Sequence, residues 1–278
     1  MNVVANGDTR RQVLGIEVVF ADGSVGSRLY GVAKKSTGPD LFQLMVGSEG
    51  TLGVITAARL RLLPQVMDLM VTLVGVGSLE EGLRYLPESG VHAAEFFDHA
   101  CLELVMRHRG LSRPLPSDAP LYVLIESSQP PQVTENVEAV VDRRLWAYRE
   151  SITETVNQIG VPVKLDVAVP LGRMDELVTA IHGLGLDGDI YLWGHLAEGN
   201  FHVNVVGSPD PDQVIDRVLE VVVGLGGVIA SEHGIGVAKT DWWRRSSDPA
   251  TLEFSRRIKE ALDPSHILNP EVFWKGGG

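Results

Sequence analysis

The sequence of 278 residues predicts a fold of the α+β class. Short apolar runs with the alternation of strands recur at residues 69–74, 93–97, 121–126 and 163–169. Between these runs, apolar residues recur every three or four positions, which is typical of amphipathic helices. A strand-rich segment precedes both patterns and ends at Pro64, where we place a domain boundary.

The first 64 residues are predicted to form a small unit rich in strands. Residues 13–20 and 24–29 have the pattern of two strands joined by an Ala-Asp-Gly turn. Residues 39–46 resemble a short helix that opens on proline. A glycine-rich turn at residues 47–53 then leads into a strand that continues to Leu63. Such glycines suit a phosphate-binding loop, but taken alone they favour a plain tight turn.

The clearest helix is predicted to begin near Thr134 and to continue to Ile159. Arg149 lies beside its apolar stripe, with Thr153 one turn further along. An arginine at the edge of a buried face is either a surface charge or a fork that binds a carboxylate. The stripe consists of Val137, Val141, Leu145, Tyr148, Ile152, Val156 and Ile159. Further helices are predicted near residues 171–184, 211–225 and 249–262.

A pair of histidines on a predicted hairpin is the first chemical signal. Residues 189–193 and 201–206 have strand patterns, and residues 197–200 (Ala-Glu-Gly-Asn) have the composition of a turn. With this loop, His195 would lie opposite His202 on the same face, about 5 Å away at Cβ. Two imidazoles that converge from a rigid hairpin are half of a metal site.

The other half is predicted at residues 231–236 (Ser-Glu-His-Gly-Ile-Gly), which follow the apolar run at 227–230. This segment supplies Glu232 and His233. Imidazoles and a carboxylate suit Zn²⁺ or another divalent transition metal, and three protein ligands leave one position open for substrate. The alternative is a pair of hydrogen-bonded histidines with an unrelated loop glutamate, and the residues alone leave both interpretations open.

Composition argues against several classes of protein. The formal net charge of −12 gives nucleic acid no electrostatic reason to bind. Cys101 is the single cysteine, so an intrachain disulfide is excluded, and its apolar neighbours predict a core position. Glu220 and three glycines interrupt the longest apolar run, so we expect no transmembrane span. Without the pattern of a signal peptide at the N-terminus, we predict a soluble, cytoplasmic protein.

Two familiar motifs are dismissed. Residues 183–188 match G-x-G-x-x-G, but they follow a predicted helix and precede a predicted strand, whereas a dinucleotide fingerprint needs the reverse order. We interpret them as a helix end and a loop. Neither Ser24 nor Ser48 lies in a G-x-S-x-G elbow, so a serine hydrolase has no support.

Together the motifs resemble a known family, the flavin-dependent 2-hydroxy-acid dehydrogenases of the vanillyl-alcohol-oxidase type with an FAD-linked oxidase C-terminal domain. This family includes D-lactate dehydrogenases, glycolate oxidase large subunits and D-2-hydroxyglutarate dehydrogenases. The histidine hairpin and the Glu-His-Gly-Ile-Gly loop are its most specific features here. The resemblance covers essentially the whole chain and rests on residues 14–23, 35–41, 47–53, 194–204, 232–236 and 262–270.

The resemblance implies an architecture of two parts. Residues 1–64 would be the second half of a two-part FAD-binding domain. Residues 65–278 would form a ferredoxin-like antiparallel-sheet substrate domain flanked by helices, with a tail at 263–278 that returns toward the flavin. On this resemblance, the first half of the FAD domain would be missing from this sequence. A start at an internal methionine, a fragment, or a separate polypeptide that supplies the first half would each explain this.

The resemblance also implies the roles of individual residues. The metal ligands would be His195, His202 and Glu232, and the general base would be His233. The substrate carboxylate would be held by Arg149, Thr153 and Lys164. The residues nearest FAD would be Gly47, Ser48, Glu49, Gly50, Gly53, Val54, Ile55 and Asn269.

The implied function is the oxidation of a D-2-hydroxy acid of the lactate, glycolate or 2-hydroxyglutarate class, with FAD as hydride acceptor and Zn²⁺ or Mn²⁺ as the metal. A flavin-free fragment or accessory subunit of such an enzyme, and a metal-dependent hydrolase, remain as alternatives. We expect weak or absent FAD in the isolated chain and an uncovered apolar surface near residues 47–56. A second polypeptide that completes the flavin domain or accepts electrons, and a homodimer, are left open.

Overall fold

The computed structural model describes residues 2–30, 32, 38–134 and 137–274. The chain divides into two compact units. The large unit consists of Met1–Asn6 and Gln65–Glu232, and the small unit consists of Gly7–Pro64 and His233–Gly278. The division at Pro64 coincides with the boundary placed from the sequence. Residues 233–278, however, group with the N-terminal segment and not with the rest of the region assigned to the substrate domain.

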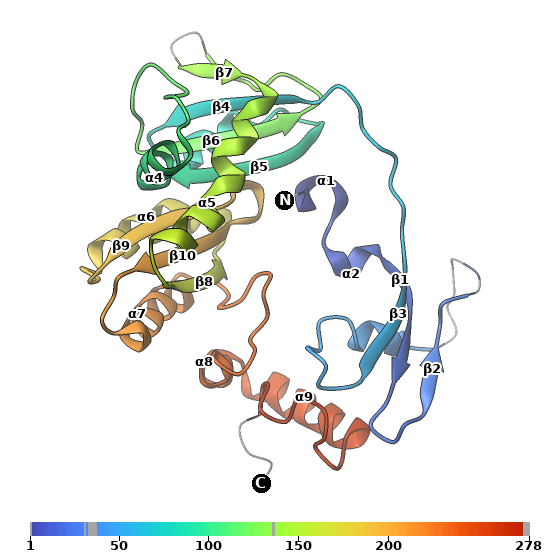
Figure 1. The fold of residues 1–278 in the computed structure, drawn as a ribbon. Coiled ribbons are helices and arrows are strands. Elements are labelled where there is room, and N and C mark those ends of the chain that lie inside the picture. The colour runs from blue at the N-terminus through green and yellow to red at the C-terminus, as the bar shows by residue number, and fades with distance from the viewer. Residues whose placement is uncertain (1, 31, 33–37, 135–136, 275–278) are drawn as a thin grey trace. The chain divides into compact units, whose positions relative to one another are not determined.

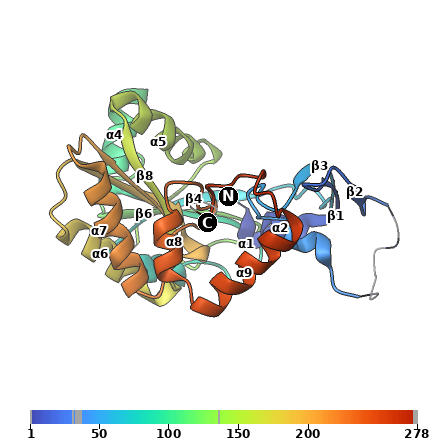
Figure 2. The same ribbon diagram turned by 90° about the horizontal axis from the view of Figure 1, so that it is seen from below.

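The large unit is a seven-stranded sheet with helices on both faces (Figures 1 and 2). Each pairing within this described sheet is antiparallel, which confirms the predicted α+β class with an antiparallel sheet. The strands lie in the order β7 (Ala139–Val141), β4 (Met70–Val76), β6 (Leu121–Ser127), β5 (Val91–Asp98), β9 (Asp189–His195), β10 (Asn200–Val206) and β8 (Pro162–Ala168).

The helices of the large unit cover the two faces as separate layers. Helices α4 and α5 lie on one face, and α6 and α7 lie on the other (Figure 2). The α-helices are α1 (Val3–Asn6), α3 (Leu79–Arg84), α4 (His99–Arg109), α5 (Trp146–Ile159), α6 (Met174–Gly183) and α7 (Pro211–Gly224). Single 3-10 turns are η2 (Arg143–Leu145), η3 (Leu171–Arg173) and η4 (Leu196–Glu198). Helix α6 ends at Gly183, so the G-x-G-x-x-G match is a helix end and a loop, as predicted.

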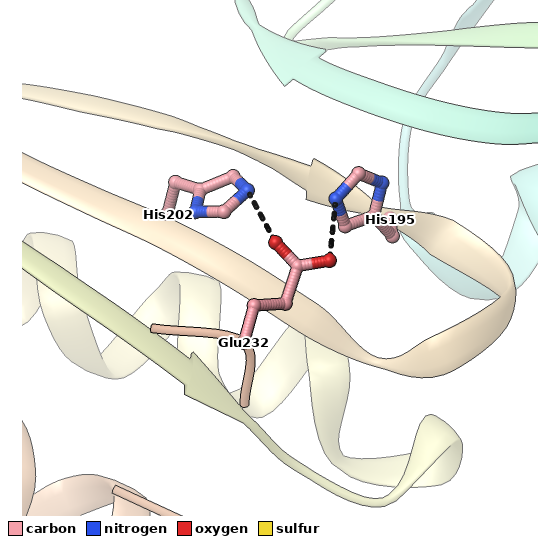
Figure 3. Close-up of side chains that lie close together, drawn as sticks. All are labelled: His195, His202 and Glu232. Carbon is pink, nitrogen blue, oxygen red and sulfur yellow. Dashed lines mark ion pairs between the residues drawn. The ribbon is translucent and has the colours of Figure 1, made fainter. Parts of the chain in front are cut away.

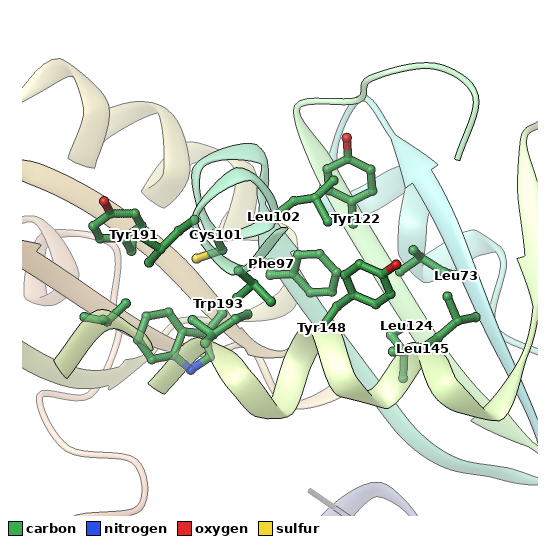
Figure 4. Close-up of a cluster of buried hydrophobic side chains, with 14 of the residues drawn as sticks. Leu73, Phe97, Cys101, Leu102, Tyr122, Leu124, Leu145, Tyr148, Tyr191 and Trp193 are labelled. Atoms are coloured by element: carbon green, nitrogen blue, oxygen red, sulfur yellow. The ribbon is translucent and has the colours of Figure 1, made fainter. Parts of the chain in front are cut away.

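The main core lies between the sheet and helices α4 and α5 (Figure 4). Strand alternation turns Phe97, Tyr191 and Trp193 toward these helices, which contribute Leu102 and Tyr148. Full burial of each large apolar side chain stabilises the fold by about 1.5–3 kcal/mol relative to exposure. Cys101 is fully buried in the same cluster, which confirms its predicted core position.

Helix α5 begins later than the sequence suggested. The stretch predicted as its first turns contains strand β7, which pairs with β4, and then η2. Asp142 separates the two because its side chain accepts a hydrogen bond from the Arg144 N–H and caps the 3-10 turn. The helical prediction is therefore wrong at Val141, which is 62% exposed. It is correct from Trp146 onward, where Tyr148, Ile152 and Val156 of the stripe are buried.

The small unit contains a three-stranded antiparallel sheet in the order β2 (Val25–Ser27), β1 (Val13–Val19) and β3 (Val54–Leu60). Its described residues form the helices α2 (Thr9–Gln12), α8 (Thr240–Ser246) and α9 (Pro249–Leu262) and the 3-10 turn η1 (Leu41–Leu44). The helix predicted at residues 39–46 is thus a single 3-10 turn. Within the family motif at residues 35–41, residues 35–37 lie outside the described residues.

The small unit is held together by a core and by one buried lysine. Leu262 of α9 packs against Ile16 and Val18 of β1, so the C-terminal helix covers the N-terminal sheet. Lys259 Nζ donates to the carbonyl oxygens of Thr51 and Leu268 at 2.8 and 2.6 Å. The tail therefore folds back onto the glycine-rich turn. In the described part of the chain, no helix has both the length and the apolar character needed to cross a membrane.

Candidate metal centre

The loop of the histidine hairpin begins one residue earlier than predicted, at residue 196 instead of 197. His195 pairs with Asn200, and His202 pairs with Trp193, so the register is shifted by two residues from the expected pairing of the two histidines. A shift of two residues preserves the face of each side chain. The rings of His195 and His202 consequently still converge, with centroids 5.4 Å apart in an edge-to-face arrangement.

Gly199 closes the four-residue loop at its observed position. It has φ of 64° and closes η4 by donating its N–H to the Leu196 carbonyl. A Cβ at this position would lie 2.1 Å from the Val169 carbonyl oxygen, so glycine is required both by its backbone conformation and by its packing. The sequence indicated a turn here, but the close approach to Val169 depends on tertiary structure.

Glu232 completes a cluster of three potential ligands (Figure 3). One carboxylate oxygen lies 3.3 Å from His195 Nε2 and the other lies 3.9 Å from His202 Nε2. In a tetrahedral site with bonds of about 2.1 Å, ligand atoms are separated by about 3.4 Å. The donor set and its spacing therefore fit a divalent transition metal after small side-chain rotations.

The segment that carries Glu232 is fixed to the edge of the sheet. Val228 and Ala168 exchange two backbone hydrogen bonds, which attach this segment to β8. Buried Asp166 then accepts from the backbone N–H groups of Ser231 and Glu232 at 3.1 and 2.6 Å. Its other oxygen accepts from the Asn200 side chain at 2.7 Å. Asp166 therefore binds the backbone of the candidate ligand Glu232.

A second buried carboxylate lies behind His195. Glu95 of β5 pairs with His195 across the sheet, and its two oxygens bind different partners. One lies 2.7 Å from His195 Nδ1, and the other lies 2.8 Å from Arg149 Nη2. Since a carboxylate oxygen accepts, Nδ1 carries a hydrogen toward Glu95, and Nε2 faces Glu232. The sequence offered one signal that was not used, a lone acid in the apolar run at residues 93–97.

Arg149 is an interior residue, only 5% exposed. This decides between the two interpretations of its helix position, because an arginine paired with buried Glu95 is not a surface charge. Thr153, one turn further along α5, is exposed. Lys164 of β8 is also exposed and pairs with Asn204, so it shares the sheet face of His202.

The electrostatics of the two histidines are opposite. Burial opposes protonation of His195, but the hydrogen bonds and charges of Glu232 and Glu95 outweigh it and raise its pKa to about 9. For His202, burial together with the positive charges of Arg149 and His195 lowers the pKa to about 4. The hydrogen bond from His195 lowers the pKa of Glu232. His202 and Glu232 are therefore in ligand-competent states at neutral pH, while a cation at His195 Nε2 must displace a proton.

His233 follows Glu232 in the sequence and begins the second segment of the small unit. The loop of His233 is held by Glu49, whose two carboxylate oxygens accept from the N–H groups of Ile235 and Gly236, both at 2.8 Å. The carbonyl oxygen of Glu49 accepts from the Asn269 side chain at 2.5 Å. The glycine-rich turn, the His233 loop and the C-terminal tail thus meet at one residue.

The other residues expected near FAD lie in the same turn and in β3. Gly47 and Gly50 have positive φ values of 83° and 70°, as a tight turn requires, and Ser48 is buried. A Cβ on Gly53 would lie 2.4 Å from Val18 Cγ1, so packing accounts for that glycine. Val54 and Ile55 of β3 are 51% and 43% exposed.

Comparison with known proteins identifies the class. Residues 68–272 match the family described as FAD linked oxidases, C-terminal domain, and the chain belongs to this family. It is 36% identical over 304 residues to D-2-hydroxyglutarate dehydrogenase, mitochondrial, from Bos taurus, with 97% of this chain and 56% of that protein covered. It is 29% identical over 308 residues to D-2-hydroxyglutarate dehydrogenase from Stutzerimonas stutzeri, with 97% of this chain and 66% of that protein covered. The chain therefore spans between half and two thirds of these relatives.

Two solved structures show the same fold at low sequence identity. p-Cresol methylhydroxylase with substrate bound superposes with a TM-score of 0.63 at 14% identity, over 95% of this chain and 65% of that one. Alkyldihydroxyacetonephosphate synthase also superposes with a TM-score of 0.63. The sequence identity is 13%, and the match covers 97% of this chain and 55% of that one. These similarities confirm the predicted fold class.

Proposed function

We propose that this chain supplies the metal- and substrate-binding part of an FAD-dependent enzyme that oxidises a D-2-hydroxy acid to the 2-oxo acid. The observation that carries the proposal is the cluster of His195, His202 and Glu232 beside a buried arginine. Membership of the FAD linked oxidase family supports the flavin chemistry. The names of the relatives favour the 2-hydroxyglutarate class of substrate over lactate or glycolate.

A divalent ion, Zn²⁺ or Mn²⁺, would be held by His195 Nε2, His202 Nε2 and Glu232. When bound, such an ion polarises the substrate hydroxyl and lowers its pKa. Asp166 and Glu95 keep two of the three ligands in place through hydrogen bonds to the Glu232 backbone and to His195 Nδ1. These hydrogen bonds would hold the donor set in place, and three protein ligands would leave a coordination position open for a substrate oxygen.

The substrate carboxylate would be held by Arg149 and Lys164, with Thr153 nearby on α5. The Nε–H of Arg149 has no hydrogen-bond partner among the described residues, so the guanidinium keeps donors for a carboxylate. Lys164 adds a positive charge on the same sheet face as His202. Together they would orient a 2-hydroxy acid with its hydroxyl toward the cluster.

His233 is the proposed general base for the hydroxyl proton, since imidazole is the side chain that titrates near neutral pH. Its loop is kept in shape by Glu49. FAD, when bound, supplies the hydride acceptor. We propose that the surface formed by the turn at residues 47–50, by Gly53, Val54 and Ile55 of the β3 segment, and by Asn269 faces the flavin. A further part of the flavin domain, on a longer chain or on a separate polypeptide, would complete that site.

The metal site can be tested on this chain alone. After treatment with EDTA, calorimetric titration with Zn²⁺ or Mn²⁺ should give one ion per chain. His202→Ala should abolish this binding because one of three protein ligands is lost. His108→Ala, which changes an exposed histidine at the end of α4, is the matched control and should bind as the unaltered chain does.

Substrate binding can be measured without flavin. D-2-hydroxyglutarate should bind to the metal-loaded chain and much more weakly to the metal-free chain, and Arg149→Lys should weaken binding about tenfold or more because lysine lacks the planar fork. Reduction of an electron-accepting dye by the same substrate should require FAD and the rest of the flavin domain. An unaltered chain that binds neither metal nor hydroxy acid contradicts the proposed function.

A further inference from the structure

Glu95 is the most deeply buried charged residue next to the candidate metal centre. Its side chain is 0% exposed, and it lies on β5 near the middle of the seven-stranded sheet. The neighbouring strand residues on the same face, Phe97 and Trp193, belong to the apolar core. An acid at this position interrupts an otherwise apolar surface, and burial of a carboxylate is unfavourable unless it is well paired.

The pairing of Glu95 exceeds what charge compensation requires. Arg149 alone neutralises the carboxylate, with Nη2 at 2.8 Å from one oxygen. The other oxygen is 2.7 Å from His195 Nδ1, on the residue directly opposite in β9. An ion pair buried only for stability gains little over a well-packed apolar pair, so the bond to His195 needs a separate explanation.

The two contacts fix two functional side chains relative to each other. With Nδ1 bound to Glu95, the His195 ring can turn little, and its Nε2 stays 3.3 Å from Glu232. With Nη2 bound to the same carboxylate, the guanidinium of Arg149 is held next to that ring. Glu95 is therefore the shared anchor of a candidate metal ligand and a candidate substrate ligand that come from different elements, β9 and α5.

We propose that Glu95 is a positioning residue that sets the orientation of His195 for metal binding and, through the same carboxylate, the place of Arg149 for the substrate. The inference rests on the proposed function, because it concerns the same site. Glu95 touches neither metal nor substrate in this role. Its effect on metal affinity is transmitted through the His195 ring, as for carboxylates that orient zinc-bound histidines.

The test compares Zn²⁺ affinity in two variants that each replace one glutamate by an isosteric amide. Glu95→Gln keeps the volume and removes the charge, and we expect Zn²⁺ affinity to fall about 10- to 100-fold. Glu126→Gln is the control. Glu126 lies on the adjacent strand β6, and its carboxylate accepts from the Trp146 indole at 3.2 Å, so the same chemical change should leave Zn²⁺ affinity unaltered.

A second variant keeps the test decisive if Glu95→Gln folds poorly. The double substitution Glu95→Leu with Arg149→Met removes both buried charges, so neither is left unpaired and the net charge of the site is the same. Circular dichroism should show a folded protein, and Zn²⁺ affinity should still fall at least tenfold because the His195 contact is gone.

A spectroscopic readout follows His195 itself. In two-dimensional ¹H–¹⁵N spectra of the metal-free chain, the Nδ1–H of His195 should be visible and protected from solvent, and this signal should be lost in the double variant. Zn²⁺ binding that is unchanged in both Glu95 variants overturns the inference and leaves the proposed function intact. An unaltered chain that binds no Zn²⁺ overturns both.

Discussion

In the large unit, Arg149 and Glu95 pair at 2.8 Å between α5 and β5, and in the small unit Lys259 and Asp263 pair at 2.5 Å at the end of α9. Both pairs are buried. Their remaining partners differ. Glu95 also binds the ring of His195, whereas Asp263 accepts from the backbone N–H groups of Ile267 and Leu268, and Lys259 donates to backbone carbonyls.

The difference shows how a buried ion pair acquires a role. When the residues of a buried pair also form hydrogen bonds to other side chains, the pair determines where those side chains point, and so shapes a site. When they form hydrogen bonds to backbone groups instead, the pair determines the path of the chain. The small unit uses the second kind to fold its tail onto the glycine-rich turn, and the large unit uses the first kind at its candidate metal centre.

The largest effect is expected from Arg149→Met. The variant leaves Glu95 as an unpaired charge in the interior, so the free energy of unfolding should fall by about 3–5 kcal/mol. Urea unfolding followed by circular dichroism measures this. Arg257→Met, at an exposed position on α9, should change it by no more than about 0.5 kcal/mol. A loss below about 1 kcal/mol for Arg149→Met would mean that the pair is not effectively buried.

Lys259→Met should lower the free energy of unfolding by less than Arg149→Met does, by about 1.5–3 kcal/mol. Asp263 loses its cation but keeps two backbone N–H donors, so its charge is only partly uncompensated. The same unfolding experiment gives the magnitude. Hydrogen exchange should in addition show faster exchange at residues 267–268, because the tail loses its anchor. If Lys259→Met were more damaging than Arg149→Met, the distinction between the two pairs would fail.

The small unit should also lose stability in acid through Asp263. Burial acts to raise the pKa of this carboxyl, but the bonds from Lys259 and from the Leu268 and Ile267 N–H groups outweigh it and lower the pKa below 3.8. A group with a lowered pKa in the folded state adds stability above its unfolded pKa, and this stability disappears as the pH falls through the folded value. Unfolding free energies between pH 2.5 and 6 should therefore decline at the acid end. Asp263→Asn should flatten that decline, and Asp212→Asn, at an exposed site on α7, should not.

The smallest effect is expected on β3, where the small unit exposes apolar side chains. Ile55→Thr should change the unfolding free energy by no more than about 0.5 kcal/mol, because the side chain is 43% exposed. Ile16→Thr on the neighbouring strand makes the matched change at a buried position. Ile16→Thr should lower the unfolding free energy by about 2 kcal/mol or more, since it removes packed atoms and buries a hydroxyl. Equal effects of the two substitutions would show that this face of β3 is not an open surface.

The local pattern of apolar and polar residues was enough to predict, from the sequence alone, the face of several strand residues and the position of two helices. Strand alternation placed His195 and His202 on one face even though their register was off by two residues, because the period of a strand is two. Periodicity also gave α9 with the bounds that the structure shows, and the buried part of the α5 stripe. Each of these features depends on residues that are close in sequence.

Tertiary structure alone decided the features that join distant segments. Glu95 and Asp166 carry no local motif. They become part of the candidate metal centre only because β5 pairs with β9 and because the segment before Glu232 attaches to β8. The grouping of residues 233–278 with 7–64 likewise depends on contacts such as Lys259 with Thr51. Burial and strand pairing are set by the whole fold, so the partners of a buried charge cannot be deduced from residues near it in the sequence.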